Sequence, residues 1–234
     1  MRTIAIGDIH GCLKALDGLI EAINPGASDR LIFLGDYVDR GPDSRGVIER
    51  LIALQTRCKT IYLLGNHEII FRSVLSGFPA DTWLRIGGQQ TLASYGGTLE
   101  GVPNSHVDFL CGLLPSYETE RCLFVHANYD ANLALSEQTE QTLFWEHLGE
   151  KLPLPHYSGK HVILGHTPQA NFEIGYFGHF TCIDTYCFGN GWLTALEVES
   201  GEVWQVSQTG VLRQNIGILK LLWRRFDELR ARSP

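Results

Sequence analysis

The chain has 234 residues, of which 44% are hydrophobic and 19% are charged, and this composition is typical of a folded globular protein rather than a disordered or fibrous one. A chain of this length can bury a substantial core, so we predict a single domain over residues 1–234. The formal net charge of −7 argues against binding to duplex nucleic acid, which requires a basic surface. A phosphate-containing substrate is still compatible, because a bound metal ion can reverse the local charge.

The six cysteines are scattered and include no Cys-x-x-Cys pair, which is typical of free thiols in a reducing compartment. No apolar stretch is long enough for a membrane span or a signal peptide. We therefore expect a cytoplasmic protein with no membrane partner. The sequence leaves the oligomeric state open, with a monomer as the default.

Short apolar runs closed by glycine or by a polar residue recur along the chain, and they predict buried strands. In chain order these runs are residues 4–6, 31–34, 61–64, 123–125, 162–164 and 180–183. Between the first three lie two stretches, 13–23 and 44–54, whose apolar residues recur at helical spacing. Strand, helix and strand in this order predict βαβ units and hence an α/β fold.

The remaining segments are assigned from weaker patterns. Residues 72–121 are less regular, and we predict a helical insert or cap there. Residues 192–206 alternate between apolar and polar, which predicts closing strands. Within 213–234, residues 216–231 predict an amphipathic terminal helix that is rich in arginine, and we expect its apolar face to pack onto the domain.

A carboxylate, amide or imidazole follows each predicted strand. These residues are Asp8 and His10, Asp36, Asn66, His126, His166 and Asp184. Since the carboxyl ends of strands open into one crevice in α/β sheets, we expect the side chains to converge. A donor set of oxygen and imidazole nitrogen without thiolate disfavours a structural zinc site and favours a reactive Mn²⁺, Fe²⁺ or Zn²⁺ site. Each short motif is weak alone, and the prediction depends on their order and matched positions.

Five of these motifs resemble the signatures of a known family. They are GDIHG at 7–11, GDYVDRG at 35–41, GNHE at 65–68, VHA at 125–127 and GHT at 165–167. Together they resemble the PPP-type serine/threonine phosphoprotein phosphatases of the calcineurin-like metallophosphoesterase superfamily, over about residues 4–198. The run 83–96 is similar to the bacterial and phage branch. The resemblance implies a metallophosphoesterase β-sandwich flanked by helices, with a dinuclear metal site at the strand carboxyl ends.

The resemblance also implies a set of metal ligands. Two divalent ions would bind, with Mn²⁺ expected first and Fe²⁺ or Zn²⁺ as alternatives. Asp8 and His10 would hold the first ion, and Asp36 would bridge both. The second ion would be held by Asn66, His126 and His166.

Further roles are implied for residues beside the metals. A metal-bridging hydroxide would attack phosphorus in line, and His67 would protonate the leaving group as a general acid. Asp39 would orient His67 and keep it protonated, and Arg40 would bind phosphate oxygens in a bidentate manner. Asn66 would also contact the substrate. Asp184 would either orient a ligand or close a strand-end turn, and Glu68 would act as a structural cap.

The sequence departs from the family pattern at one place. Members usually carry a second phosphate-binding arginine after the VHA motif, but here no arginine occurs between Arg121 and Arg213. His147 lies where we expect the missing arginine, as a weaker substrate-binding residue. We therefore predict a competent metal centre with altered phosphate binding, with an ordinary surface histidine as the alternative.

These features predict a metal-dependent phosphomonoester hydrolase, with phosphoserine and phosphothreonine proteins as the first substrate class and small phosphoesters as the second. The alternative is a symmetrical dinucleoside tetraphosphate hydrolase, a branch that tends to have GNHD and to lack an intact VDRG. Glu68 and the intact Asp39–Arg40 pair favour the phosphatase. A third possibility, a metal-binding scaffold of low turnover, is supported only by the missing arginine.

Overall fold

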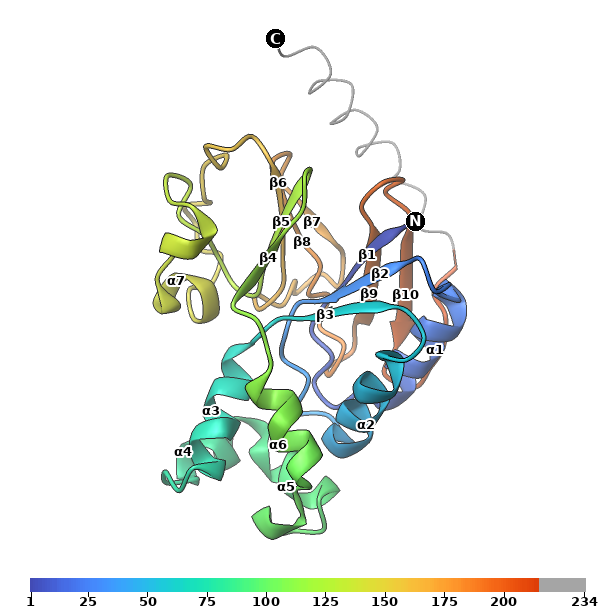
Figure 1. Cartoon of the computed structure of the whole chain (residues 1–234), viewed down its shortest axis with the longest axis vertical. Helices are drawn as coiled ribbons and strands as arrows, with labels where there is room; N and C mark the ends of the chain where they lie inside the picture. Colours follow the sequence, from blue (N-terminus) through green and yellow to red (C-terminus); the bar gives the residue numbers. More distant parts are fainter. Residues whose placement is uncertain (215–234) are drawn as a thin grey trace.

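The computed structural model describes residues 1–214, and the predicted terminal helix at 216–231 lies outside them. Two five-stranded sheets pack against each other as two layers (Figure 1). The first has the order β10-β9-β1-β2-β3, with strands β1 (Thr3–Ile6), β2 (Arg30–Phe33), β3 (Lys59–Tyr62), β9 (Trp192–Glu197) and β10 (Val203–Ser207). The second has the order β4-β5-β6-β8-β7, with strands β4 (Ser116–Glu118), β5 (Cys122–Val125), β6 (His161–Leu164), β7 (Gly175–Tyr176) and β8 (Phe180–Cys182). The predicted α/β sandwich is therefore confirmed.

The six apolar runs of the sequence correspond to the parallel strands of the two sheets. In the first sheet β1, β2 and β3 run parallel, and in the second β5, β6 and β8 do. The segment predicted to hold closing strands contains β9, antiparallel to β1, and β10, antiparallel to β9. Between the layers the inward residues of the two sheets are buried together, among them Ala5, Ile32, Phe124 and Ile163.

Two helices connect the parallel strands of the first sheet, with the predicted bounds. Helix α1 (Leu13–Ile23) ends where Asn24 takes a left-handed φ of 44° and Pro25 follows. Helix α2 (Ser44–Leu54) begins after Asp43, whose Oδ1 accepts the Gly46 N–H at 2.8 Å. The apolar faces of both helices pack onto the first sheet. The cap at Asp43 sets where the loop after β2 ends and α2 begins.

The segment predicted as a helical insert is helical over most of its length and forms the lower part of Figure 1. Its elements, together with the helix that leads into it, are α3 (Asn66–Leu75), α4 (Asp81–Trp83), the π-helical turn η1 (Leu84–Gly88), α5 (Gln89–Ser94), the 3₁₀ turn η2 (Leu99–Gly101) and α6 (Asn104–Cys111). The prediction of a helical insert is wrong at its C-terminal end, where β4 pairs antiparallel with β5. Tyr117 of β4 packs into the apolar layer between the sheets, which favours a strand there.

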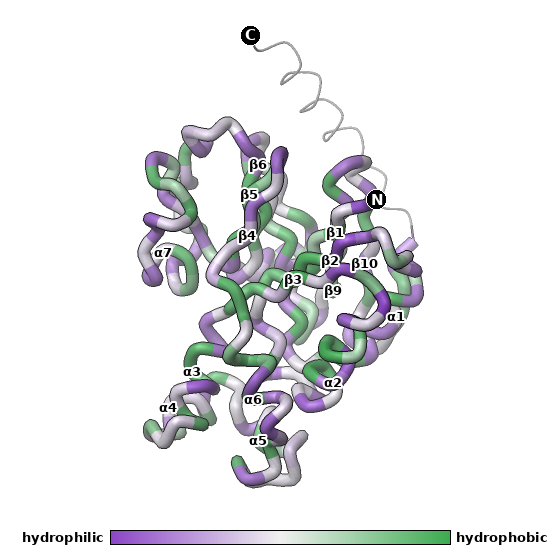
Figure 2. Tube along the Cα trace, viewed as in Figure 1, coloured by the Kyte–Doolittle hydropathy of each residue, from purple (hydrophilic) through white to green (hydrophobic). Residues whose placement is uncertain are grey.

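The outer face of the second sheet is covered by the 3₁₀ turn η3 (Leu135–Glu137) and helix α7 (Glu140–Phe144). Leu143 and Phe144 pack against Val125 and Leu164 in an apolar cluster of their own. Figure 2 shows hydrophobic segments through the middle of the molecule, where the sheets meet.

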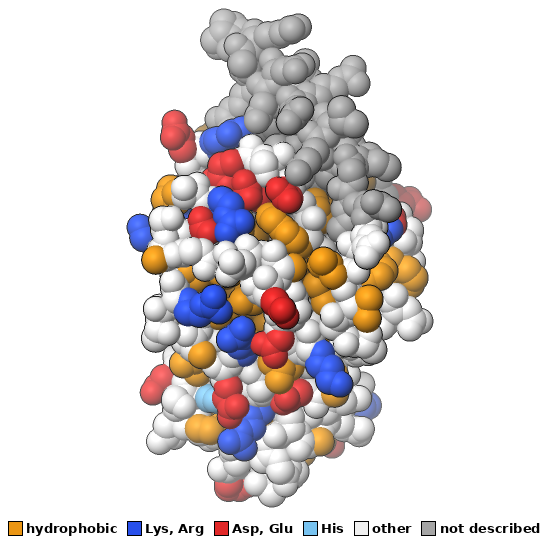
Figure 3. Space-filling view, turned by 90° about the vertical axis from the view of Figure 1, so that its right-hand side faces the viewer, with side chains coloured by type: hydrophobic (Ala, Val, Ile, Leu, Met, Phe, Trp, Pro, Cys, Tyr) orange, Lys and Arg blue, Asp and Glu red, His pale blue; other side chains and the backbone are white. Residues whose placement is uncertain are grey.

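The outer surface beside α1 and α2 mixes both signs of charge (Figure 3). Arg50 pairs with Asp17 there and Arg45 with Glu49. This face therefore offers no continuous basic patch. Within residues 1–214, none of the helices is both long and apolar enough to cross a membrane.

Candidate metal centre

The loops that follow the parallel strands are tied together by backbone hydrogen bonds. The N–H groups of Ile9 and His10 both donate to the Asp36 carbonyl, at 3.0 and 2.8 Å, and the Gly165 N–H donates to the His126 carbonyl at 2.8 Å. The structure therefore brings the predicted polar residues of both sheets to one place, as the strand order requires.

Two groups of potential metal ligands share the Asp36 carboxylate. One group is His10, Asp36 and His67, and the other is Asp36, His126 and His166; in each, the ligand atoms lie within 4.8 Å of one another and all three residues are buried. Asp36 Oδ2 lies 3.4 Å from His10 Nε2, and Asp36 Oδ1 lies 3.4 Å from His126 Nε2. One carboxylate oxygen thus faces each group, which is the arrangement that a bridging ligand needs.

Hydrogen bonds to main-chain carbonyls orient two of the histidines. His10 Nδ1 lies 2.9 Å from the Val38 carbonyl oxygen, and His126 Nδ1 lies 2.9 Å from that of Leu34. A proton on Nδ1 leaves Nε2 with a free lone pair toward Asp36. Burial lowers the pKa of both imidazoles, that of His10 strongly, so both are neutral at pH 7 and able to bind a cation.

The side-chain oxygen of Asn66 lies between the histidines of the second group. Asn66 Oδ1 is 3.1 Å from His126 Nε2 and 3.1 Å from His166 Nδ1. Burial, followed by the neighbouring His126, lowers the pKa of His166 to about 3. Three neutral donors therefore converge beside Asp36, as expected from the sequence.

Asp8 lies beside the two groups without belonging to either. Its Oδ2 accepts the His166 N–H at 3.0 Å, while its buried Oδ1 has no hydrogen-bond partner among the described residues. Burial, followed by the charges of Asp184 and Asp36, raises the pKa of Asp8 well above its ordinary value. The free oxygen is an available ligand, and a cation would relieve its desolvation.

Unsatisfied buried atoms indicate that the site is built for cations. Among residues 1–214, Asp8 Oδ1, His166 Nε2 and Asp184 Oδ2 are buried without a hydrogen-bond partner. Native proteins rarely leave buried polar atoms unpaired unless a water or ion completes them. The donors are carboxylate, amide and imidazole, so the residues fit a pair of hard or borderline divalent ions and do not single out one metal.

A hydrogen bond to Asp39 orients the His67 side chain. His67 Nδ1 lies 2.6 Å from Asp39 Oδ2, and both side chains are buried. Burial works to lower the pKa of His67, but the charge of Asp36 and the bond to Asp39 raise it overall. Although His67 is close enough to His10 and Asp36 to be grouped with them as a ligand, its carboxylate partner favours the role of proton donor.

The helical insert supports this histidine–carboxylate pair through contacts that the sequence did not predict. Asp39 Oδ1 accepts the Trp83 Nε1–H at 2.9 Å and the Thr91 hydroxyl at 2.7 Å. Both donors are buried, and the Trp83 ring stacks on Phe71. The only sequence signal was the resemblance of the run 83–96 to the bacterial and phage branch, which names no contact.

The same insert also fixes the main chain of Arg40. The Arg40 N–H donates to the Gly87 carbonyl at 3.0 Å. Gly87 has a φ of 125°, and a Cβ at this position would lie 2.6 Å from the Arg40 nitrogen, so a side chain is excluded. The Arg40 guanidinium donates to His10 Nε2 at 3.2 Å and lies 4.5 Å from the centre of the Phe188 ring. It is therefore directed at the ligand set.

His147 lies against the second group of ligands. Its ring stacks on that of His166 with centroids 4.2 Å apart and planes 19° from parallel, and the residue is otherwise exposed. The structure thus places it beside the centre, where the sequence located the missing arginine. A neutral imidazole offers one N–H donor, which binds phosphate less strongly than the paired donors of a guanidinium.

Glu68 fixes the two loops that carry Asp36 and Asn66. Its Oε2 accepts the N–H groups of Asp36 (2.8 Å) and Gly65 (3.1 Å), and its Oε1 accepts those of Tyr37 (2.7 Å) and Val38 (3.2 Å). A Cβ on Gly65 would lie 2.2 Å from Asp36 Oδ1, so only glycine fits. The predicted structural role of Glu68 thus extends beyond capping α3.

Several residues of the centre have left-handed backbone conformations. Such values are uncommon for residues other than glycine and gather at functional sites, where the surrounding structure maintains them. The positive φ values are those of His10 (45°), Asp36 (51°), Asp39 (70°), Arg40 (68°) and His166 (62°). Asp184 closes a turn by accepting the Tyr186 N–H at 3.0 Å, one of its two expected roles, and its other oxygen is the unpaired one noted above.

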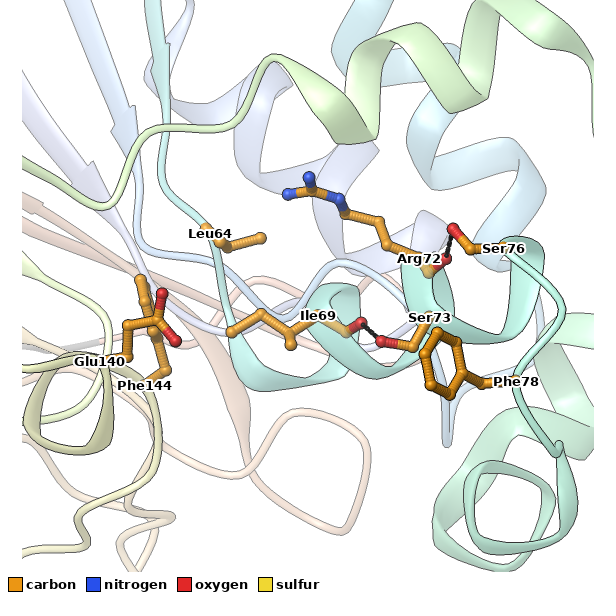
Figure 4. Close-up of a pocket in the computed structure, with 8 residues that line it drawn as sticks. All are labelled: Leu64, Ile69, Arg72, Ser73, Ser76, Phe78, Glu140 and Phe144. Atoms are coloured by element: carbon orange, nitrogen blue, oxygen red, sulfur yellow. Dashed lines mark hydrogen bonds between the residues drawn. The ribbon is translucent and has the colours of Figure 1, made fainter.

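A hollow of about 330 Å³ lies between α3 and α7 (Figure 4). Ile69 and Ser73 line it and lie one and two turns beyond Asn66 on the same face of α3. Arg72 and the 67%-exposed Phe78 contribute a cation and an aromatic ring. We call this hollow the α3–α7 pocket.

Comparisons with known proteins agree with this geometry. The family model for calcineurin-like phosphoesterases matches residues 1–195. A symmetrical bis(5'-nucleosyl)-tetraphosphatase from Ralstonia nicotianae is 42% identical to the chain over 73 residues, which are 31% of the chain and 25% of that relative. The matched segment therefore spans only about a quarter of the curated relative.

Solved structures share the fold across different activities. A crystal structure described provisionally as that of a diadenosine tetraphosphatase has a TM-score of 0.65 at 24% identity, covering 88% of this chain and 92% of the other. The cold-active protein-tyrosine phosphatase of a Shewanella species has a TM-score of 0.66 at 16% identity, covering 91% and 79%. At these identities the likeness concerns the fold alone.

We predict that Trp83→Phe weakens proton donation by His67 without unfolding the insert. The phenyl ring can still stack on Phe71, but Asp39 loses one of its two side-chain donors. A lost bond to a charged group is worth ~1.5–3 kcal/mol, or about tenfold to 150-fold in rate if fully expressed. The measurement is kcat/KM for alkyl phosphates against p-nitrophenyl phosphate, with Mn²⁺.

The alkyl phosphates should lose more, because their leaving groups need the proton. Thr91→Val should act in the same direction and Thr91→Ser should restore the rate. Trp204→Phe in β10 is the matched control. Equal losses for both leaving groups would show that Trp83 has only a structural role.

We predict that His147→Arg strengthens phosphate binding, because a guanidinium donates two charge-assisted hydrogen bonds where imidazole donates one. KM for a phosphorylated substrate should fall several-fold. Gln55→Arg adds the same charge at an exposed site on the far end of α2 and should leave KM unchanged. An unchanged KM in His147→Arg would refute the missing-arginine interpretation.

We predict that Glu68→Gln destabilises both the fold and the centre. A glutamine presents one acceptor oxygen to four N–H groups and leaves buried donors unpaired, at a cost of about 1–3 kcal/mol each. Thermal melting should shift downward and Mn²⁺ content per chain should fall. The exposed control Glu49→Gln should melt within a degree or two of wild type. A Glu68→Gln protein with normal melting and full Mn²⁺ content would show that these bonds are dispensable.

Proposed function

The chain belongs to the calcineurin-like phosphoesterase family, and we propose that it is a metal-dependent hydrolase that splits dinucleoside tetraphosphates symmetrically into two nucleoside diphosphates. The observation that carries the reaction class is the position of Asp36, with one carboxylate oxygen toward each group of ligands. The tetraphosphatase name of the curated relative supports the substrate class.

In this proposal the first ion is held by Asp8, His10 and Asp36, and the second by Asp36, Asn66, His126 and His166. When bound, such a pair supplies Lewis acidity and a water of lowered pKa. Arg40, assisted by Asn66 and His147, binds the phosphate oxygens and orients the chain of phosphates. We further propose Mn²⁺ as the physiological metal and the cytoplasm as the location.

His67 and Asp39 supply the proton side of the reaction. Asp39 holds the imidazole through Nδ1, so that Nε2–H is the group that can donate to the departing oxygen. Trp83 and Thr91 fix Asp39 from the opposite side. This assignment depends on no metal ion, because the side chains of His67, Trp83 and Thr91 are each hydrogen-bonded to Asp39.

The same pair supports a second candidate, a serine/threonine protein phosphatase. An alkoxide leaving group, as in phosphoserine, needs a proton, whereas a nucleoside diphosphate is a good leaving group without one. The buried histidine and carboxylate lie 2.6 Å apart, and two further donors fix the carboxylate. Cleavage of a phosphoanhydride does not require such a proton donor. This observation therefore favours a phosphomonoester as the second candidate substrate.

The deciding experiment compares diadenosine tetraphosphate with a phosphoserine peptide as substrates of the full chain loaded with Mn²⁺. We predict a kcat/KM at least tenfold higher for the dinucleotide, with ADP as the sole nucleotide product, and loss of turnover in EDTA. A higher kcat/KM for the peptide would select the phosphatase. If neither substrate is turned over with any divalent ion, the protein would instead be a metal-binding scaffold of low turnover.

A further inference from the structure

The loop after β8 places an aromatic side chain directly on the candidate centre. The Phe188 ring meets the His10 ring edge-on, with centroids 4.8 Å apart, and the Arg40 guanidinium carbon lies 4.5 Å from the Phe188 centroid. Phe188 is therefore in contact with both a proposed ligand and the proposed phosphate-binding arginine. The catalytic roles described above give it no function.

Two more rings continue outward from Phe188. Tyr186 lies 4.6 Å from Phe188 at an interplanar angle of 81°, and Phe172 lies 6.2 Å from Tyr186 with planes only 9° from parallel. All three side chains are partly exposed, unlike the aromatic residues of the core. We call Phe172, Tyr186 and Phe188 the aromatic wall.

Two residues of the wall have left-handed backbone conformations. Phe172 and Tyr186 have φ values of 61° and 66°, in the left-handed region where bulky residues are outliers. The Phe172 N–H donates to the Gln169 carbonyl at 2.8 Å, and the Gly189 and Gly191 N–H groups donate to the Tyr186 carbonyl at 3.1 Å each. Strain of this kind persists where the structure maintains it and gathers at ligand-binding sites.

We propose that the aromatic wall is the nucleoside subsite, where a base stacks on Tyr186 and Phe172 while its phosphates lie at Arg40 and the metal ligands. The inference rests on the proposed tetraphosphatase function and names the residues that select its substrate. Aromatic faces bind any base, because stacking does not read hydrogen-bonding edges. A wall whose inner end contacts the phosphate-binding arginine matches a ligand with a flat ring joined to a chain of phosphates.

The rival location for the nucleoside is the α3–α7 pocket (Figure 4). The residues that line it include neither Arg40 nor a proposed metal ligand, and its exposed ring, Phe78, projects from the surface. The wall is favoured because its rings are already aligned and connected to Arg40. The two locations can be separated by the same substitution made in each.

The test compares ADP with inorganic pyrophosphate by isothermal titration of the Mn²⁺-loaded full chain. The two ligands share a diphosphate and differ by the nucleoside, so the ratio of their Kd values isolates the nucleoside contribution. We expect wild type to bind ADP at least tenfold more tightly. Phe172→Asn and Tyr186→Asn should each reduce this ratio at least about fivefold, the lower end of the range for losing one aromatic stacking partner, with no preference as the limit.

Asparagine is chosen because it tolerates left-handed φ values and removes the ring. Tyr186→Phe should keep the ratio, and so should Phe78→Asn in the α3–α7 pocket. Equal melting temperatures and Mn²⁺ content verify that the variants are folded and loaded.

The proposal is overturned if wild type shows no preference for ADP, if neither wall variant changes the ratio, or if Phe78→Asn abolishes it. These outcomes differ from failure of the proposed function. A wild type that prefers ADP but does not cleave diadenosine tetraphosphate would keep the subsite and refute the activity. One that cleaves the dinucleotide without preferring ADP would keep the activity and refute the wall.

Discussion

Each oxygen of the buried Glu68 carboxylate accepts two backbone N–H groups, and the four donors come from two loops that follow different strands. This interaction fixes Asp36 relative to the start of α3, and hence relative to Asn66 and His67. Burial, followed by the charge of Asp36, raises the pKa of Glu68 to about 8, while the backbone N–H groups that it accepts work to lower it. Two acceptor oxygens are needed to satisfy all four donors. The distance between the two ligand groups thus depends on a residue that belongs to neither.

The electrostatics of the centre follow from that scaffold. Asp8, Asp36 and Asp184 are buried close together, facing histidines that burial keeps neutral. Burial, together with the charge of Asp36, raises the pKa of Asp184 to about 7, although the Tyr186 N–H and Arg40 work to lower it. A cluster of carboxylates at this depth is costly without cations. The net charge of −7, which first excluded only duplex binding, therefore includes a local charge that divalent ions are placed to neutralise.

The sequence predicted what periodicity and strand order determine. The bounds of α1 and α2 follow from apolar spacing and caps, and the convergence of polar side chains follows from their positions at strand ends. It could not predict Trp83 and Thr91 as partners of Asp39, because that contact joins segments 44 and 52 residues apart and has no local pattern. The edge strand β4 was missed for a related reason, since three residues pair only because β5 lies beside them. His147 was located from a departure in a family motif, and its stacking on His166 is a tertiary contact.

The fold itself does not decide the substrate. Structures of a tyrosine phosphatase and of a protein described as a tetraphosphatase superpose on this chain almost equally well. The proposed ligands and the His67–Asp39 pair would serve phosphorus chemistry in general, so discrimination between substrates must come from side chains that contact the rest of the substrate. Around this centre those side chains lie in loops and in the insert, where length and sequence change without disturbing the sheets. Of the two candidate surfaces, the α3–α7 pocket is lined mainly by residues of α3, α7 and the loop after α3, whereas the aromatic wall contacts both His10 and Arg40. Differences in such loop residues can therefore change the substrate while the sheets and the centre stay the same.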